Sequence, residues 1–399
     1  MRFKRTVIFI ITVAVTAVFF ASCGKSGKNE GVIKIGTISP NTGVMSVYGE
    51  AVTKAYRLAV SEINQNGGVL GKQLELVIKD DQMVSSECVN AFNSLAAEGV
   101  EFVIGSVSSS CTAAICEMAN EEGIVLITPT STADSITTED DYVFRACFAD
   151  SFQGKIAAGF AKEKGYDKVA ALYCTADTYS KGIYDSFEKA CGDYGIEIVL
   201  TESVSDIATC TDFSNQWTSI VNTGVGFVFA PFYYYTVAPY IVPQAREAGY
   251  DGIIMGSDSY DGANLPDYIG YGSDITYFDN VYFTNHYDPS DSSDKVRLFV
   301  EAYEAEYKET PHAFAALAYD SVYMLSAAIE KAGCASAAKV RTALSDRNTE
   351  YDCVTGKFTL DYTGTPIKDV SIVKYVSDKK TGTVKTLLDS KAKRTGGEK

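Results

Sequence analysis

Histidine and tryptophan are scarce in this chain. Among 399 residues there are two histidines, His286 and His312, and one tryptophan. Two histidines leave few candidates for a histidine-rich zinc site or for a triad that depends on histidine. The sequence also lacks a GxSxG, HExxH or Walker motif, and no GxGxxG follows the first predicted strand. We therefore expect no enzyme activity, no metal and no cofactor.

Positive charge is in the minority, and it is not gathered into runs. Lys and Arg number 35 against 51 Asp and Glu, which gives a formal net charge of −16. Without a basic run or a basic-aromatic patch, nucleic acid is a poor candidate for the partner. Apolar residues make up 46% and charged residues 22%, as in ordinary globular proteins. The length is sufficient for two domains.

No CxxC pair occurs, which argues against a zinc ribbon or a thioredoxin-type site. The chain has ten cysteines, and nine remain when Cys23 is set aside. Because nine is odd, at least one must be free or bonded to another chain. We expect most of them to be small buried apolar residues, with one or two disulfide bridges.

A single long apolar run lies at the N-terminus. A basic segment, Met1–Arg5, precedes 15 uncharged residues, Thr6–Phe20, and this order is typical of a secretory signal. The run is short for a helix that crosses a hydrocarbon core of roughly 30 Å. Phe20–Cys23 resembles the bacterial lipobox, which implies that Cys23 is lipidated and begins the mature chain. We expect residues 1–22 to be a signal peptide and 23–31 a lipidated tether; a plain cleaved signal and an uncleaved anchor are the alternatives.

Strands and helices alternate along the rest of the chain. Short apolar strands are expected near 32–38, 74–81, 102–105 and 124–127, each followed by a helical segment. The same pattern starts again near 150, with strands near 168–173, 196–200, 226–230 and 253–256. Such alternation predicts an α/β fold with parallel sheets that carry helices on both faces. We expect two similar doubly wound, Rossmann-like lobes with a cleft between them.

The loops after these strands carry two kinds of chemistry. In the first half, residues 105–110 and 128–132 offer hydroxyls and backbone N–H groups at helix starts, which suit a carboxylate. In the second half, residues 176–180, 231–235 and 257–261 offer phenols and carboxylates, which suit an ammonium group. Ligands of open parallel sheets bind beyond the carboxyl ends of the strands. The alternative is that these side chains only cap helices.

An ordered set of motifs resembles those of a known family. They run from about Val32 to the final strands: Glu62–Gly71, Gly105–Ser110, Ile127–Thr132, Phe144–Arg145, Gln244–Gly249 and Ala313–Asp320. The set resembles the branched-chain amino-acid binding proteins of ABC importers, which have the type I periplasmic binding fold. No motif is diagnostic alone; the order makes the set specific.

The resemblance implies roles for polar residues of the cleft. Ser109 would bind the ligand carboxylate through its hydroxyl, and Thr132 through its N–H and hydroxyl. The Ser131 carbonyl would help to hold the ammonium group. Asp258 would be the counter-ion of that ammonium.

The same resemblance implies that tyrosines contact the ligand, and it offers four candidates. Tyr179 and one tyrosine of the run 233–235 would close over the ligand from the second lobe. Tyr234 is the first choice in that run and Tyr233 the second. Tyr48 would flank the pocket for the ligand side chain.

The family's chain crosses between its lobes three times. By resemblance, we place the crossings near Cys147, Thr284 and Tyr351. The predicted parts are lobe 1 (32–147 and 285–350), lobe 2 (148–284 and 351–390) and a disordered tail (391–399).

The predicted function is ligand capture for an importer. A monomer would bind a branched-chain or other apolar α-amino acid, close by a hinge motion and deliver the ligand to ABC permease subunits. It would be tethered to the outer face of the cytoplasmic membrane, in the periplasm if the host has two membranes. A ligand-sensing lipoprotein on the same scaffold is the alternative.

Overall fold

The computed structural model describes residues 31–139, 141–206, 209–261, 274–288, 290–381 and 383–393. The side chains of residues 234–239 are outside this description. The predicted signal peptide, the lipidation site Cys23 and nearly all of the tether also lie outside the described residues.

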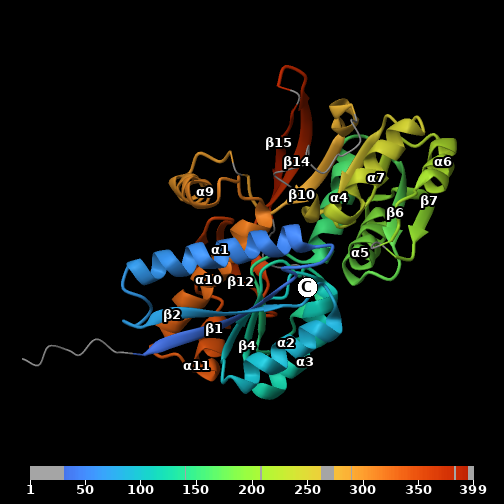
Figure 1. Cartoon of the computed structure of the whole chain (residues 1–399). Helices are drawn as coiled ribbons and strands as arrows, with labels where there is room; N and C mark the ends of the chain where they lie inside the picture. Colours follow the sequence, from blue (N-terminus) through green and yellow to red (C-terminus); the bar gives the residue numbers. More distant parts are fainter. Residues whose placement is uncertain are drawn as a thin grey trace, which may run out of the picture.

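The first sheet is parallel throughout and is covered on both faces. Its five strands run in the order β2-β1-β3-β4-β5. They are β1 (Val32–Ser39), β2 (Gln73–Asp80), β3 (Phe102–Ile104), β4 (Val125–Thr128) and β5 (Val143–Arg145). Six helices belong to this half (Figure 1): α1 (Ser46–Gln65), α2 (Ser85–Ala97), α3 (Ser109–Glu122), α9 (Asp294–Tyr307), α10 (Ala313–Ala332) and α11 (Ala337–Leu344).

Strand β3 shows why the central strands are continuously apolar. Phe102 and Ile104 belong to the hydrophobic cluster that includes α1 and α10, whereas Val103 belongs to the cluster of α2 and α3. Successive side chains of a strand point to opposite faces, so a strand covered twice needs apolar residues at every position.

The second sheet has seven strands in the order β15-β14-β10-β9-β8-β6-β7. Five are parallel: β6 (Lys168–Cys174), β7 (Glu197–Val204), β8 (Phe227–Phe229), β9 (Ile253–Gly256) and β10 (Val281–Asn285). An antiparallel hairpin, β14 (Val370–Asp378) and β15 (Thr383–Ala392), completes the sheet. The helices are α4 (Asp150–Glu163), α5 (Thr178–Tyr194), α6 (Ser214–Thr223) and α7 (Tyr234–Glu247), with 3₁₀ turns η2 (Asp258–Tyr260) and η3 (Ile275–Phe278). The predicted α/β architecture of two lobes is confirmed.

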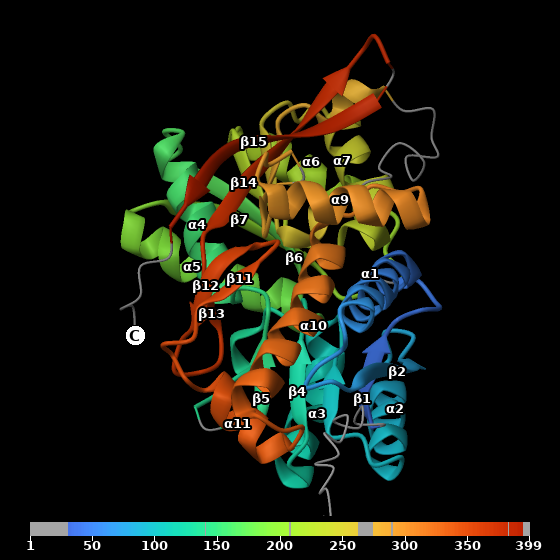
Figure 2. The same cartoon turned by 90° about the vertical axis from the view of Figure 1, so that its left-hand side faces the viewer.

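The chain passes between the two sheets three times, from β5 to α4, from β10 to α9 (Asp294–Tyr307) and from β13 to β14. A small antiparallel sheet precedes the last passage, and Figure 2 shows it at mid-height in the molecule. Its strands are β11 (Tyr351–Cys353), β12 (Gly356–Leu360) and β13 (Pro366–Ile367). The lobe boundaries stay a prediction.

The small sheet is bonded to the edge of the first sheet. The N–H of Arg145 donates to the carbonyl of Gly364 at 3.3 Å, and the hydroxyls of Thr137 and Thr365 are 3.0 Å apart. Strand β15 continues to Ala392, one residue past the predicted start of the tail. Thus the chain's last third contributes to both halves of the molecule, as its orange and red elements show in Figures 1 and 2.

The cysteines behave as core residues and not as cross-links. All nine in the described part of the chain are unbridged, and six of them are buried. The expected one or two bridges are therefore not present among these nine. A thiol that fills a core position behaves as a small apolar group.

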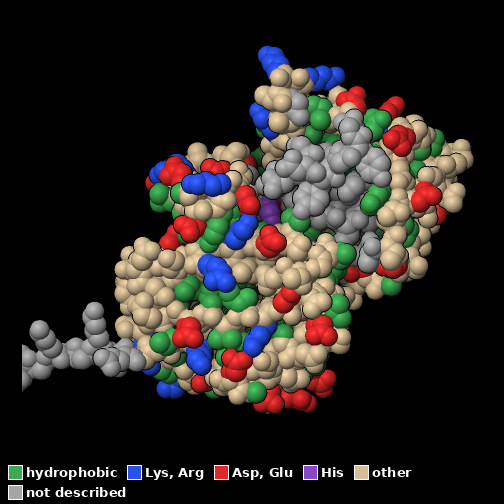
Figure 3. Space-filling model, viewed as in Figure 1, with side chains coloured by type: hydrophobic (Ala, Val, Ile, Leu, Met, Phe, Trp, Pro, Cys, Tyr) green, Lys and Arg blue, Asp and Glu red, His purple; other side chains and the backbone are tan. Residues whose placement is uncertain are grey.

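Three further observations concern membrane-spanning helices, metal-binding groups and surface charge. No helix of the described ranges is long and apolar enough to cross a membrane. Likewise, the part of the chain that the structure describes has no group of three or more His, Cys, Asp or Glu residues able to hold a metal. On the face in Figure 3, cationic and acidic side chains are interspersed over the first half, whereas the charged side chains at the right of the second half are acidic.

Candidate functional site

The first lobe contributes a helix start and a hydroxyl-rich loop. Ser108 caps α3, because its hydroxyl accepts from the N–H of Cys111 at 3.2 Å. The next residue, Ser109, is buried, and its hydroxyl accepts from the N–H of Ala133 at 3.3 Å. The unpaired N–H groups and the dipole at a helix start favour a negative charge nearby. This corner of the cleft therefore suits a carboxylate.

Thr132 lies in the same corner. Its side chain is fully buried, and its hydroxyl has no well-aligned hydrogen-bond partner among the described residues. The Asp150 carboxyl lies near it: burial raises the pKa of Asp150 well above its usual value, and the Thr132 hydroxyl lowers that pKa in part. A buried hydroxyl without a good partner costs free energy, so Thr132 is suited to bond to a bound ligand.

The second lobe contributes a buried carboxylate. Asp258 opens the turn η2, directly beyond the carboxyl end of β9, and it is fully buried. The Tyr179 hydroxyl donates to Asp258 Oδ1 at 2.5 Å, and Nε2 of His286 lies 2.8 Å from Oδ2. The backbone N–H of Asp258 donates to Gln153 Oε1 at 3.1 Å. Among the residues that the structure describes, no Lys or Arg forms an ion pair with Asp258, so this carboxyl group is left for a ligand cation.

Aromatic rings join the two lobes. Tyr48 of α1 donates to the carbonyl of Ser259, next to Asp258, at 2.6 Å. In the second lobe, Tyr233 stacks on Tyr179 with ring centroids 4.5 Å apart. The backbone N–H of Ser109 bonds to the Tyr233 hydroxyl across the cleft and lowers its pKa, although burial raises that pKa well above its usual value. These contacts hold the two sets of strand-end loops together.

Of the two candidate tyrosines in the run, only Tyr233 has a side chain that the structure describes. Tyr234 opens α7, and its side chain lies outside the described part of the structure. Tyr233, the second choice, lies between Tyr179 and the first lobe. The choice of Tyr234 as the ligand contact stays a prediction.

Ser131 faces into the first lobe and not toward Asp258. Its hydroxyl is 2.6 Å from that of Thr112 and lies within reach of the carbonyl of Ser106. Its carbonyl, predicted to hold an ammonium group, accepts from Arg145 Nη1 at 3.3 Å and from the thiol of Cys147 at 3.4 Å. The structure thus gives this carbonyl partners of its own lobe.

A buried guanidinium supports the hydroxyl-rich loop. Arg145 is fully buried and donates to the carbonyls of Thr132 and Ala133, at 2.7 and 2.9 Å, and to the Thr137 hydroxyl at 2.9 Å. Because these carbonyls point toward Arg145, the guanidinium fixes the conformation of the loop. The charge of Arg145 also lowers the raised pKa of Asp150 in part.

The structure therefore brings five of the predicted residues into one buried region. They are Tyr48, Ser109, Thr132, Tyr179 and Asp258. Sequence reasoning did not select Gln153 or His286, which hold Asp258 from α4 and from the segment after β10. The sequence carried a signal for each: Gln153 follows the Phe144–Arg145 motif and, with Gly154, also matches the family, and His286 directly follows a strand that ends at the cleft.

Comparisons with known proteins agree with this architecture. A model of the periplasmic binding protein family matches residues 32–381. A leucine-, isoleucine-, valine-, threonine- and alanine-binding protein of Pseudomonas aeruginosa is 30% identical over 335 residues, which cover 83% of this chain and 86% of that protein. A Leu/Ile/Val-binding protein of Rhizobium johnstonii is 32% identical over 354 residues, 88% of this chain and 93% of that protein.

Solved structures are similar over nearly the whole chain. The branched-chain amino acid transporter substrate binding protein LivJ of Streptococcus pneumoniae, in complex with isoleucine, is 33% identical with a TM-score of 0.81; the match covers 91% of this chain and all (100%) of that one. The leucine binding protein LivK of Thermotoga maritima is 29% identical with a TM-score of 0.80, over 90% of this chain and 99% of that one. With its two doubly wound lobes and the buried strand-end loops between them, this chain belongs to the periplasmic binding protein family.

Proposed function

We propose that this protein is the extracytoplasmic ligand-capture subunit of an ABC importer and binds a branched-chain or other apolar α-amino acid. The observation that carries the proposal is the opposed chemistry of the cleft. The start of α3 and the Thr132 hydroxyl lie on one side, and the Asp258 carboxylate lies on the other. An α-amino acid has one anionic and one cationic group, and this site offers a partner for each.

The aromatic side chains support an apolar ligand side chain. Tyr48 packs on Phe314 of α10 with ring centroids 4.8 Å apart, and His312 lies edge-on to Tyr48 at 6.0 Å. Burial lowers the pKa of His312 to about 4, so this ring is neutral at pH 7. The relatives described above are named for binding leucine, isoleucine and valine, which agrees with a ligand pocket bordered by these uncharged rings.

Capture requires that the lobes open and close. Tyr48 and Ser259 belong to opposite lobes, and the bond between them shuts the cleft. A ligand that touches both lobes gains contacts only in the closed form, and this difference in contact drives closure.

A thermal-shift screen tests the proposal. We expect isoleucine, leucine or valine to raise the melting temperature, whereas lysine and glutamate should not. A ligand at 100 times its Kd adds about 2.7 kcal/mol of stability. Stabilisation by sugars or polyamines, with no response to any α-amino acid, would contradict the proposed function.

We also propose that the protein is lipid-anchored through Cys23 and acts as a monomer beside its permease. Support comes from the sequence alone: a basic start, an apolar run and a small-residue motif that ends at Cys23. A diacylglyceryl group supplies two chains, which is enough for stable anchoring. Intact-mass analysis of the native protein should show this adduct on a chain that begins at residue 23. An unmodified N-terminus at another residue would exclude lipidation.

A further inference from the structure

His286 forms a hydrogen bond with the Asp258 side chain, the proposed partner of the ligand ammonium group. Its Nε2 lies 2.8 Å from Asp258 Oδ2, and both side chains are fully buried. A carboxylate oxygen can only accept, so Nε2 carries the proton and the ring is the Nε2–H tautomer. Tyr179 donates to the other oxygen. Asp258 is thereby held in one orientation by two donors.

The ring holds Asp258 without neutralising it. Burial lowers the pKa of His286 to about 4, although the hydrogen bond and the charge of Asp258 act in the opposite direction. At neutral pH the ring is therefore uncharged. A protonated histidine would form an ion pair with Asp258 and compete with an incoming ammonium group. A neutral donor orients the carboxylate and leaves its negative charge for the ligand.

The position of the ring is set by the segments that pass between the lobes. His286 directly follows β10, and its ring stacks on Phe148, which lies between β5 and α4, with centroids 3.7 Å apart. Asp258 is therefore tied to the first and the second passage as well as to its own turn. Nδ1 of His286 is buried and has no hydrogen-bond partner among the described residues, so Nε2 makes the single hydrogen bond of this ring.

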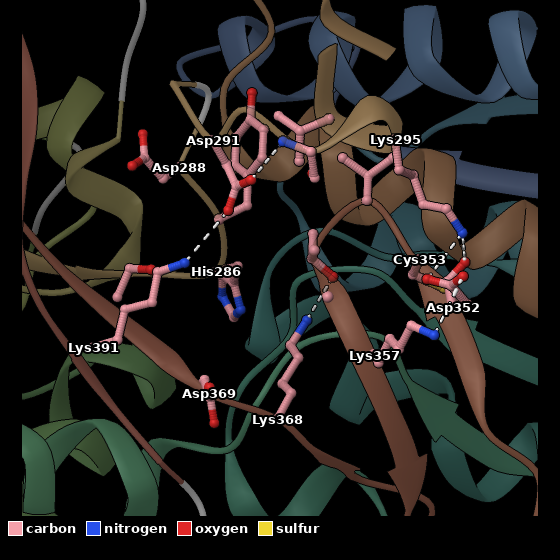
Figure 4. Close-up of a pocket in the computed structure, with 17 residues that line it drawn as sticks. His286, Asp288, Asp291, Lys295, Asp352, Cys353, Lys357, Lys368, Asp369 and Lys391 are labelled. Carbon is pink, nitrogen blue, oxygen red and sulfur yellow. Dashed lines mark hydrogen bonds and ion pairs between the residues drawn. The ribbon is translucent and has the colours of Figure 1, made fainter. Parts of the chain in front are cut away.

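His286 also lines a pocket of about 290 Å³. We call it the hinge pocket, and its lining includes His286, Asp288, Asp352, Thr355, Lys368 and Lys391. Lys368, labelled in Figure 4, donates to the Thr355 hydroxyl at 3.0 Å. Space in this pocket allows a substituted side chain at position 286 to be accommodated.

We propose that His286 is a positioning residue: its Nε2–H fixes the Asp258 carboxylate in the orientation that receives the ligand ammonium. The inference rests on the proposed function, because it assigns His286 a task in that site. It acts through Asp258, and its contribution should vanish when Asp258 has no charge to present.

Two substitutions separate the donor from the ring. His286→Phe keeps a ring that can stack on Phe148 but removes the donor. His286→Gln removes the ring but carries an amide N–H close to the position of Nε2. We expect His286→Phe to weaken isoleucine binding about 10- to 100-fold, the range for a lost hydrogen bond to a charged group. His286→Gln should recover most of this affinity.

A double-mutant cycle with Asp258→Asn is the decisive test. Calorimetry would give the Kd of isoleucine for the wild type, both single variants and the double variant, with ligand concentrations raised to match the weaker binding. In the Asp258→Asn background, we expect His286→Phe to change the Kd less than about threefold. The asparagine can be accommodated, because neutral His286 can shift its proton to Nδ1 and accept at Nε2.

The outcomes are distinguishable. An equal loss from His286→Phe in both backgrounds, or no loss in the wild-type background, would overturn the positioning role while leaving the proposed function intact. A wild type that binds no amino acid would instead overturn the proposed function, and the role of His286 with it. Unchanged affinity in Asp258→Asn would show that the ammonium group is held elsewhere, which overturns the role of His286 while amino-acid capture stands. The positioning role would be supported if His286→Gln recovers affinity and if His286→Phe weakens binding only when Asp258 is present.

Discussion

Replacing Asp258 with asparagine should weaken isoleucine binding by roughly 30-fold to several thousandfold. The substitution keeps the shape of the side chain and removes the charge that faces the ammonium group. Removing one partner of a buried charge pair costs roughly 2–5 kcal/mol, mostly because the other charge is left unpaired. At about 1.4 kcal/mol for each factor of ten, this range gives the stated loss of affinity. Titration calorimetry on both proteins measures it.

A matched control removes a carboxylate of the same lobe that lies away from the cleft. Asp251 is exposed, and Asp251→Asn makes the same change of charge. Its Kd should stay within about twofold of wild type, since exposed charges are well screened. If Asp258→Asn were to bind isoleucine within about threefold of wild type, the ammonium group would have to be held elsewhere.

Replacing Arg145 with methionine should lower the free energy of unfolding by about 2–4 kcal/mol. The guanidinium donates to the carbonyls of Ser131, Thr132 and Ala133. These carbonyls remain buried when their donor is lost, and each unsatisfied group costs about 1–3 kcal/mol. Removal of the buried charge itself gives part of this back. The loss of donors prevails, because backbone carbonyls cannot be replaced by apolar groups.

Urea unfolding, followed by circular dichroism, would measure this loss as a lower midpoint with an unchanged slope. Isoleucine affinity should fall as well, because Thr132 lies on the loop that Arg145 supports. Arg347 is exposed, and Arg347→Met should change stability by less than about 0.5 kcal/mol. Equal stability of Arg145→Met and wild type would mean that the loop keeps its conformation without the guanidinium.

The positions of the cleft residues along the fold could be predicted from the sequence. Ser109, Thr132 and Asp258 all follow apolar strands, and the carboxyl ends of parallel strands meet at one edge of a sheet. The strand-end rule therefore selects the loops that the structure brings together, before any side chain is placed. The alternation of strands and helices predicts both lobes for the same reason.

The directions of the side chains could not be predicted in the same way. Ser131 and Thr132 are neighbours, yet the hydroxyl of Ser131 bonds inside the first lobe and that of Thr132 is buried without a well-aligned partner among the described residues. This difference follows from tertiary contacts, since Thr112 of α3 supplies the partner of the Ser131 hydroxyl. Similarly, Tyr48 meets Ser259 across 211 positions of sequence, a contact that only the packing of two lobes determines.

The antiparallel pairing of β14 with the edge of the parallel sheet could not be predicted from the sequence either. Strands β14 and β15 follow a small separate sheet, and the register of β14 against β10 is set by tertiary packing. Local alternation of polar and apolar residues predicts a strand there, but it does not predict which edge that strand joins.

The most direct test of the account is a calorimetric comparison of isoleucine with 3-methylpentanoate, which lacks the ammonium group, and with isoleucine amide, which lacks the carboxylate. We predict that isoleucine binds at one site and that each analogue binds at least about 30-fold more weakly, because each leaves one side of the cleft without its partner. Equal binding of isoleucine and 3-methylpentanoate would contradict the claim that Asp258 and the hydroxyl-rich loop recognise the two ends of one amino acid.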